Sequence, residues 1–447
     1  MCEKHIPESK LHGILATSMN EVKDKIRTAL QRTASQYAEE ITDFLRDLVQ
    51  TPSLSGEEGK IAELIAGKAK VSGLPDCLID CVGNVSIEIG ETTGKKLLLL
   101  SHTDVVPPAT MSEPFSAKIV DGKSFGINGT AMYGRGTCDT KGSVCAMFMA
   151  AKILNDLHVP LNGRLTFAGV VGEESGGSRG SNQLRLNNRW DVVFVGEPSD
   201  LRVALGHRGG AFCFLRVSGQ SGHCSQPGNS VNALEKAFKI VDAIQHRLIP
   251  GLKEHDQLGK TVITFTNLVV RPGFVSIIPN EAVVQFDLRF SPLYTAESIL
   301  AQIEGLLGKL REEDSSLRAE IGFLGGITGS GREYKEVIPS FYTSPMAAEV
   351  QVLQDTIRQV TGKQPGTMIW PFATDGAFFA GPDCTVIGFG PGDPGLAHTD
   401  KECVSLDAVI QATQIYVLAA AQILGQKQAR DYQPDSRPNA LLRGGNR

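Results

Sequence analysis

The chain has 447 residues, of which 41% are hydrophobic and 21% charged, and its formal net charge is −5. This composition excludes general disorder, and the length predicts two folded domains. The negative charge, without a Lys/Arg stripe, argues against nucleic-acid binding, and no apolar run approaches the length of a membrane span.

The first half of the chain alternates between predicted helices and strands. Residues 1–20 show no regular pattern, and apolar residues at helical spacing then run from Glu21 to Gln50, where Thr51-Pro52 ends them. Further helices are predicted at 57–70 and 143–157, and strands at 84–89, 97–101, 165–171 and 192–195. This order predicts a doubly wound α/β sheet.

The pattern changes near residue 205. Strands are predicted at 211–217, 262–270, 282–290 and 317–323, with helices at 231–246 and 297–310. This βαββαβ order predicts an inserted, ferredoxin-like α+β domain with an antiparallel sheet. The earlier pattern resumes after about residue 335, with a helix at 347–360, a strand at 384–389 and a closing helix at 406–424.

These patterns divide the chain into five segments. We expect an irregular N-terminal extension (1–20), an α/β domain in two parts (21–204 and 326–425), the inserted domain (205–325) and a flexible tail (426–447). The nine cysteines form no C-x-x-C pair, and Met1 to Pro7 lack the apolar core of a signal peptide. We therefore expect free thiols and a cytoplasmic location.

Acidic and histidine side chains stand at or just after the ends of the predicted strands. In open α/β sheets, sites form at the carboxyl ends of strands. Oxygen and imidazole ligands without thiolate favour a catalytic metal, and five of them suit two ions that share a carboxylate. The candidate ligands are His102, Asp139, Glu174, Glu197 and His398.

Two further acids belong to the same pattern. Asp104 follows His102 by two residues, which suits a carboxylate that fixes a metal-binding imidazole. Glu173 and Glu174 are adjacent and cannot point the same way, so one can bind metal while the other acts as general base. Simpler interpretations remain for each part: Asp139 as a helix N-cap, and the Glu173-Glu174 pair as a solvated loop.

Several segments resemble the M20 metallopeptidase family, and within it the acetylornithine deacetylase and succinyl-diaminopimelate desuccinylase group. The resemblance covers roughly residues 36 to 425, and its motifs run in the family's order. They are His102–Pro108, Gly134–Gly142, Gly172–Ser175, Gly196–Ser199, Gly219–His223, Ile277–Ala282 with Phe286–Phe290, Thr374–Gly376 and Ala397–Glu402.

The resemblance implies a hydrolase with two divalent metal ions, zinc in the first place and cobalt or manganese as alternatives. Asp139 would bridge the two ions. His102 and Glu197 would complete one metal site, and Glu174 and His398 the other.

The resemblance also implies three catalytic residues outside the ligand set. Glu173 would be the general base and acid, and Asp104 would orient His102. The inserted domain would be a lid and dimerisation domain, from which His223 would reach the active site of the partner subunit and stabilise the oxyanion. The bond after Asp139 would be a cis peptide.

Three residues are expected to contact the substrate by the same resemblance. Arg289 lies in the segment whose arginine binds a substrate carboxylate in the desuccinylases, and its planar fork suits that task. Asn280 and Thr374 are further expected contacts. The alternative for Arg289 is an ordinary exposed strand arginine.

The reaction predicted from this resemblance is removal of the acyl group from an N-acyl amino acid by a homodimeric enzyme. A dipeptidase or aminoacylase, acting on a short peptide or another acyl amino acid, would use the same metal ligands. A one-metal enzyme is a further alternative. A non-catalytic binding protein is the most distant, because it predicts the loss of a ligand or of the base, and each has a candidate here.

Overall fold

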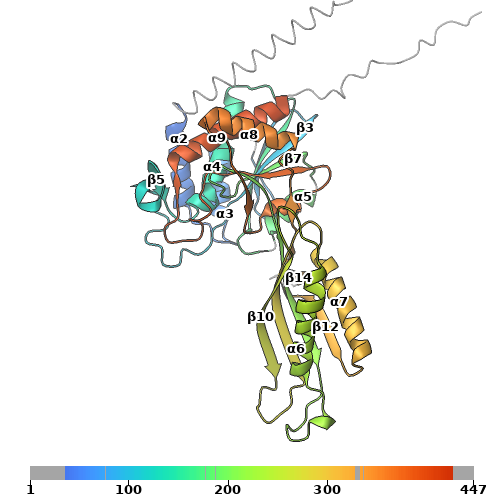
Figure 1. Ribbon diagram of the computed structural model, residues 1–447. Helices are drawn as coiled ribbons and strands as arrows, with labels where there is room; N and C mark the ends of the chain where they lie inside the picture. The colour runs from blue at the N-terminus through green and yellow to red at the C-terminus, as the bar shows by residue number, and fades with distance from the viewer. Residues whose placement is uncertain are drawn as a thin grey trace, which may run out of the picture.

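The computed structural model describes residues 36–425 except 76, 177, 187, 328–332 and 336. The expected extension (1–20), the tail (426–447) and the first part of the helix predicted from Glu21 lie outside the described residues. Figure 1 shows a main α/β domain and a narrower accessory domain that projects from it. The accessory domain carries β9 to β12 with α6 and α7.

The main domain is built on a mixed sheet with the order β1-β2-β6-β3-β7-β18-β8-β16, with β17 paired to β8. Four neighbouring strands run parallel to one another: β6, β3, β7 and β18. Strand β2 pairs antiparallel with β6, and β16 pairs antiparallel with β8. The strand bounds are β1 Leu78–Ile79, β2 Val85–Gly90, β3 Lys95–His102, β6 Gly163–Val170, β7 Val192–Val195, β8 Val203–His207, β16 Phe341–Tyr342, β17 Thr367–Trp370 and β18 Thr385–Gly388.

The four leucines of β3 show why this strand lies at the centre of the sheet. Leu97 and Leu99 pack into one hydrophobic cluster, and Leu98 and Leu100 into another on the opposite face. Successive side chains of a strand point to opposite faces, so a continuous apolar run fits a strand that is covered on both sides. The predicted α/β class is thereby confirmed.

Helices cover both faces of this sheet (Figure 1). Their bounds are α2 Ala38–Gln50, α3 Gly59–Val71, α4 Gly142–Asp156, α5 Arg179–Leu186, α8 Ala348–Thr361 and α9 Leu406–Gly425. In the described part of the chain, α9 is the one helix long and apolar enough to cross a membrane. However, 67% of its most apolar window is buried, and α9 packs on α4 and α8 as a core helix does.

A small three-stranded sheet, β19-β5-β4, was not predicted. It pairs β5 (Thr130–Tyr133) with β4 (Lys118–Asp121) and with β19 (Cys403–Ser405) from far along the chain. The pairing brings the residues before β19 against the glycine-rich turn that follows β5: the amide of Gly134 donates to the carbonyl of Glu402.

The accessory domain has its own antiparallel sheet, in the order β10-β11-β9-β12, and its own hydrophobic core. Its elements follow the predicted βαββαβ order: β9 Gly209–Ser218, α6 Ala233–Ala243, β10 Val262–Arg271, β11 Glu281–Phe290, α7 Ala296–Glu313 and β12 Arg318–Phe323. The short strand β15 (Val337–Ile338) pairs with β9, and β13 (Gly325–Ile327) pairs with β14 (Glu333–Lys335). The exact domain boundaries stay a prediction.

Candidate metal centre

His102 is the last residue of β3 and is almost fully buried. Its Nδ1 lies 2.9 Å from the main-chain oxygen of Asp104. A carbonyl oxygen only accepts, so Nδ1 carries a hydrogen and Nε2 is the nitrogen that faces the carboxylates of the centre. Nε2 lies 3.0 Å from Oδ1 of Asp139 and 3.7 Å from Oε1 of Glu197. The ring is therefore oriented as a metal ligand requires.

Asp139 lies between two histidines. While its Oδ1 faces His102, its Oδ2 lies 3.2 Å from Nε2 of His398. The same nitrogen of His398 is 2.9 Å from Oε1 of Glu174. One ligand atom each from His102, Asp139 and Glu174 lie within 4.8 Å of one another. All five predicted ligands thus converge, although they come from five separate segments of the chain.

The protonation behaviour of the centre follows from burial and crowding. Burial, and next the charge of Glu197, raise the pKa of Glu173 well above its usual range. Burial also raises the pKa of Asp139, but the His102 and His398 contacts outweigh it and leave that pKa low. Hydrogen bonds to Asp139 and Glu174 raise the pKa of His398 to about 10. Carboxylates that repel one another around two imidazoles form a donor set that fits divalent cations.

The loop that carries Glu173 and Glu174 is held by Asp104. The Glu173 amide donates to Oδ1 of Asp104 at 3.1 Å, and the Glu174 amide donates to Oδ2 at 3.0 Å. The hydroxyl of Ser55 donates to the same Oδ2 at 2.7 Å. The Asp104 carboxylate is 3.6 Å from Nδ1 of His102, so Ser55 and the two loop amides are closer to it than the imidazole it was expected to orient.

Two other buried side chains support the same loop. Oε1 of Glu58 accepts from the Gly172 amide at 3.1 Å. The Asn84 side chain accepts from the Val171 amide at 3.2 Å and donates to the Gly180 carbonyl at 2.9 Å. The segment before and after the two glutamates is thereby attached to the body of the domain.

The turn that carries Asp139 is held by Glu402, a residue with no predicted role in the site. Oε1 of this buried carboxylate accepts from the amides of Gly136, Cys138 and Asp139 at 2.9, 3.1 and 3.1 Å. Its other oxygen pairs with Arg135, which is also buried. Burial, and next the charge of Asp139, raise the pKa of Glu402 to about 7. The bond between Asp139 and Thr140 is cis.

The sequence shows the two charges of this pair but not their contact. Arg135 lies in a glycine-rich turn and Glu402 lies four positions after His398, and neither position predicts burial. Only the pairing of β5 with β19 shows that Arg135 and Glu402 meet.

The predicted substrate residues lie in different places. Thr374 is buried, and its amide donates to Nε2 of His207 at 3.0 Å. Arg289 makes two hydrogen bonds to Asp287, at 2.8 and 3.0 Å, and lies over Gly210, where a side chain would collide with its guanidinium. Gly210 is close in sequence to His207, so Arg289 lies at the end of the accessory sheet near the main domain.

Asn280 and His223 lie at the other end of the accessory domain and are exposed. Asn280 directly precedes β11, whose last residue pairs with Gly209 at the near end of the sheet. The ten residues of β11 span about 30 Å at the usual rise of a strand. Within one chain, therefore, these two residues are not brought to the metal centre.

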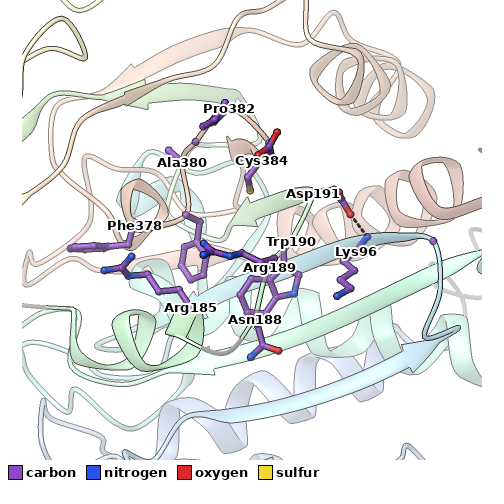
Figure 2. A pocket seen from close by; sticks show the side chains of 14 residues that line it. Lys96, Arg185, Asn188, Arg189, Trp190, Asp191, Phe378, Ala380, Pro382 and Cys384 are labelled. Carbon is purple, nitrogen blue, oxygen red and sulfur yellow. Dashed lines mark hydrogen bonds between the residues drawn. The ribbon is translucent and has the colours of Figure 1, made fainter.

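An open cavity of about 780 Å³ is a separate feature of the main domain (Figure 2). It is lined by residues at the amino-terminal ends of β3, β7 and β18, among them Lys96, Asp191 and Cys384. The candidate metal centre lies at the carboxyl ends of these parallel strands, so the two features occupy opposite edges of the sheet.

The fold and the donor set define the class of protein: a metal-dependent hydrolase built on an α/β sheet. The profile of Peptidase family M20/M25/M40 matches residues 98–422, and the chain therefore belongs to that family.

Solved structures agree with this fold. A putative aminohydrolase from methicillin-resistant Staphylococcus aureus matches with a TM-score of 0.69 and 18% identity, over 89% of this chain and 99% of that one. A tripeptidase from the same species has a TM-score of 0.65 at 20% identity, covering 86% and 99%. A dinuclear metal binding peptidase of Bacillus subtilis has a TM-score of 0.61 at 15% identity, covering 87% and 99%.

Proposed function

We propose that the chain is a two-metal amidohydrolase that removes the acyl group from an N-acyl amino acid, with acetylornithine and succinyl-diaminopimelate as the leading substrates. The observation that carries this proposal is Asp139, whose two oxygens face two different histidines. That arrangement suits a carboxylate shared by two ions, with His102 and Glu197 on one side and Glu174 and His398 on the other. Zinc is the leading metal, with cobalt or manganese as alternatives.

The protein side of the reaction centres on Glu173. Two bound divalent ions would polarise the scissile carbonyl and lower the pKa of the attacking water. Glu173 accepts a proton from that water as its oxygen attacks the carbonyl carbon. As the C–N bond breaks, Glu173 returns the proton to the leaving nitrogen. A carboxyl whose pKa is raised by burial is a competent proton donor in this second step.

Recognition of the substrate is proposed to come from both domains. Arg289 would bind a substrate carboxylate by exchanging its present partner Asp287 for it. Thr374 would add a polar contact, and Asn280, at the far end of the accessory domain, would add one from a partner subunit. His223, exposed at the far end of the accessory domain, would be supplied to the centre by a partner subunit and stabilise the oxyanion.

A homodimer is part of this proposal. The accessory domain exposes a series of large apolar side chains, and β10 is an edge strand of its sheet. An edge strand with exposed apolar residues is typical of a surface that pairs with another chain. Val262, Leu268 and Val269 lie on β10 itself, and Phe274, Val275 and Ile277 lie in the loop that follows it. Phe212 on β9 and Phe238 on α6 are exposed elsewhere on the domain.

The second candidate is a peptidase for short peptides, or an aminoacylase, on the same metal ligands. The tripeptidase among the similar structures supports the peptidase form of it. The two candidates differ in what surrounds the scissile amide and not in the chemistry at its carbonyl.

The test is hydrolysis by the metal-loaded protein of N-acetylornithine, N-succinyl-diaminopimelate, an N-acetyl neutral amino acid, a dipeptide and a tripeptide. The chelated protein is the control, and metal content is measured on each sample. Preference for one of the first two substrates supports the deacylase, and preference for a peptide supports the second candidate. If none of these substrates is hydrolysed while two ions are bound, both candidate functions are contradicted.

The cytoplasmic location is a separate prediction, checked by cell fractionation.

A further inference from the structure

A buried carboxylate beside the metal centre has no part in the function proposed above. Asp375 is 3% exposed and is the first residue of the short helix η6 (Asp375–Phe378). Its Oδ2 accepts from the hydroxyl of Ser181 at 2.6 Å. Burial raises the pKa of Asp375, and the contacts with Ser178 and Ser181 offset this only in part. Its Oδ1 is buried with no hydrogen-bond partner among the described residues.

The contact with Ser181 bears on the catalytic loop because of where α5 begins. Helix α5 starts at Arg179, a few residues after Glu174, so Ser181 lies in its first turn. Asp104 holds the amides of Glu173 and Glu174 from the β3 side. The same segment is therefore held by one buried carboxylate at each end.

Asp375 also connects this loop with the base of the accessory domain. The preceding residue, Thr374, donates its amide hydrogen to Nε2 of His207, the last residue of β8. Nδ1 of His207 lies 3.0 Å from the carbonyl of Arg208, just before β9 begins. A continuous series of contacts thus runs from the accessory sheet through Thr374 and Asp375 to the start of α5.

We propose that Asp375 is a positioning residue that sets the location of the loop carrying Glu173 and Glu174. This inference rests on the proposed function only where it predicts an effect on the rate of hydrolysis. A general base must meet its proton within a fraction of an ångström, and a displacement of about 1 Å can cost about 100-fold in rate. Asp375 reaches no reacting atom, and it acts through Ser181 and the start of α5.

The variants separate positioning from simple filling of space. Asp375→Asn keeps an oxygen that accepts from Ser181, whereas Asp375→Ala removes it. We expect Asp375→Ala to lower kcat by about 100-fold with KM changed less than about threefold, and Asp375→Asn to retain most of the rate. Ser181→Ala should lower kcat in the same way, and the double variant Asp375→Ala/Ser181→Ala should be no worse than Asp375→Ala alone. Asp383→Asn, on an exposed residue shortly after η6, is the matched control.

A second measurement does not depend on hydrolysis. Amide hydrogen exchange of the metal-free protein is followed on fragments that contain Glu173, Glu174 and Gly180, whose amides all donate hydrogen bonds. We expect exchange at these amides to quicken by about tenfold in Asp375→Ala, and to stay unchanged in Asp375→Asn and Asp383→Asn.

The outcomes are decisive in both directions. Unchanged exchange in Asp375→Ala overturns the inference, as does a loss of rate that follows loss of bound metal. If the wild-type protein cleaves no amide but the loop amides still depend on Asp375, the inference stands and the proposed function fails.

Discussion

Asp139 and Glu402 show how single residues build the centre. Asp139 faces one histidine with each oxygen, and Glu402 accepts three amides of the turn that presents it. A carboxylate with several backbone donors is fixed in place, so the turn and the acid it carries keep one geometry. Glu173 is held differently, through its backbone amide, which leaves its side chain available for proton transfer.

The first residue-scale prediction concerns Glu173. Glu173→Gln should lower kcat by about 100- to 10,000-fold, because a carboxamide cannot take a proton from water. Metal content, measured on the same sample, should stay that of the wild type, since Glu174 is the proposed ligand. Glu91→Gln, on an exposed residue, is the control. Activity above a few per cent with metal fully bound would show that the base is another group.

The second prediction concerns the buried pair of Arg135 and Glu402. Glu402→Gln keeps the oxygen that accepts the amides but leaves the Arg135 charge uncompensated. At a pH above the Glu402 pKa of about 7, where the wild-type carboxylate is ionised, the free energy of unfolding should therefore fall by about 3–5 kcal/mol. Urea unfolding measures it. Glu113→Gln breaks an exposed pair with Lys118 and should cost less than about 1 kcal/mol. Arg135→Met combined with Glu402→Gln should recover part of the loss, and equal losses in the two single glutamate variants would contradict the argument.

At the scale of elements, the site is a product of strand ends and the turns after them. His102 ends β3, the Glu173-Glu174 loop follows β6, and Glu197 follows β7. Because these strands are parallel neighbours, their carboxyl ends meet at one edge of the sheet. β8 ends at His207 and leads directly into β9, so it joins the main sheet to the accessory sheet.

His207 gives a prediction for the pH dependence of stability. Burial lowers its pKa from 6.5 to about 4. Between these values the unfolded chain binds a proton that the folded protein does not, so stability falls as the pH falls through this window. Acidification from pH 7 to pH 5 should remove about 2 kcal/mol through this residue.

The measurement is urea unfolding of the metal-free protein at both pH values. His207→Asn should show a smaller pH dependence than the wild type, whatever its absolute stability. His246→Asn, on an exposed histidine, should keep the wild-type dependence. An equal dependence in His207→Asn would mean that His207 is protonated in the folded protein as well.

At the scale of the whole molecule, one chain does not bring all the predicted residues together. His223 lies at the far end of the accessory domain, with Nδ1 2.7 Å from the hydroxyl of Ser225. Arg289 lies at the near end of the same sheet. The dimer proposed above, in which each accessory domain reaches the other subunit, would bring His223 to a metal centre.

Subunit complementation tests this arrangement. His223→Ala and Glu173→Gln should each be nearly inactive alone. In a mixed dimer, the His223→Ala subunit has an intact base and receives His223 from its partner, so one of the two centres is complete. Reassociated equimolar protein should regain about a quarter of the wild-type activity if subunits pair at random. No recovery, with mixed dimers present, would contradict the exchange of His223.

Short elements mark where prediction from sequence failed. Most long helices and strands were predicted to within a few residues, because their apolar periodicity extends over many positions. The helix predicted from Glu21 to Gln50 is an exception, because α2 begins only at Ala38, after a turn at residues 36 and 37. β8, β17, α5 and the small β19-β5-β4 sheet were missed, since strands of three to five residues and an eight-residue polar helix show too little of either period.

The sequence by itself determined the α/β class, the inserted βαββαβ unit and the acids and histidines at strand ends, because each depends on local spacing or on ordered motifs. Only the tertiary structure decided how those side chains are held. Arg135 meets Glu402 and Ser181 meets Asp375 across separations of 267 and 194 residues. Local periodicity carries no information on such contacts, which form only when the sheet places the ends of distant strands side by side.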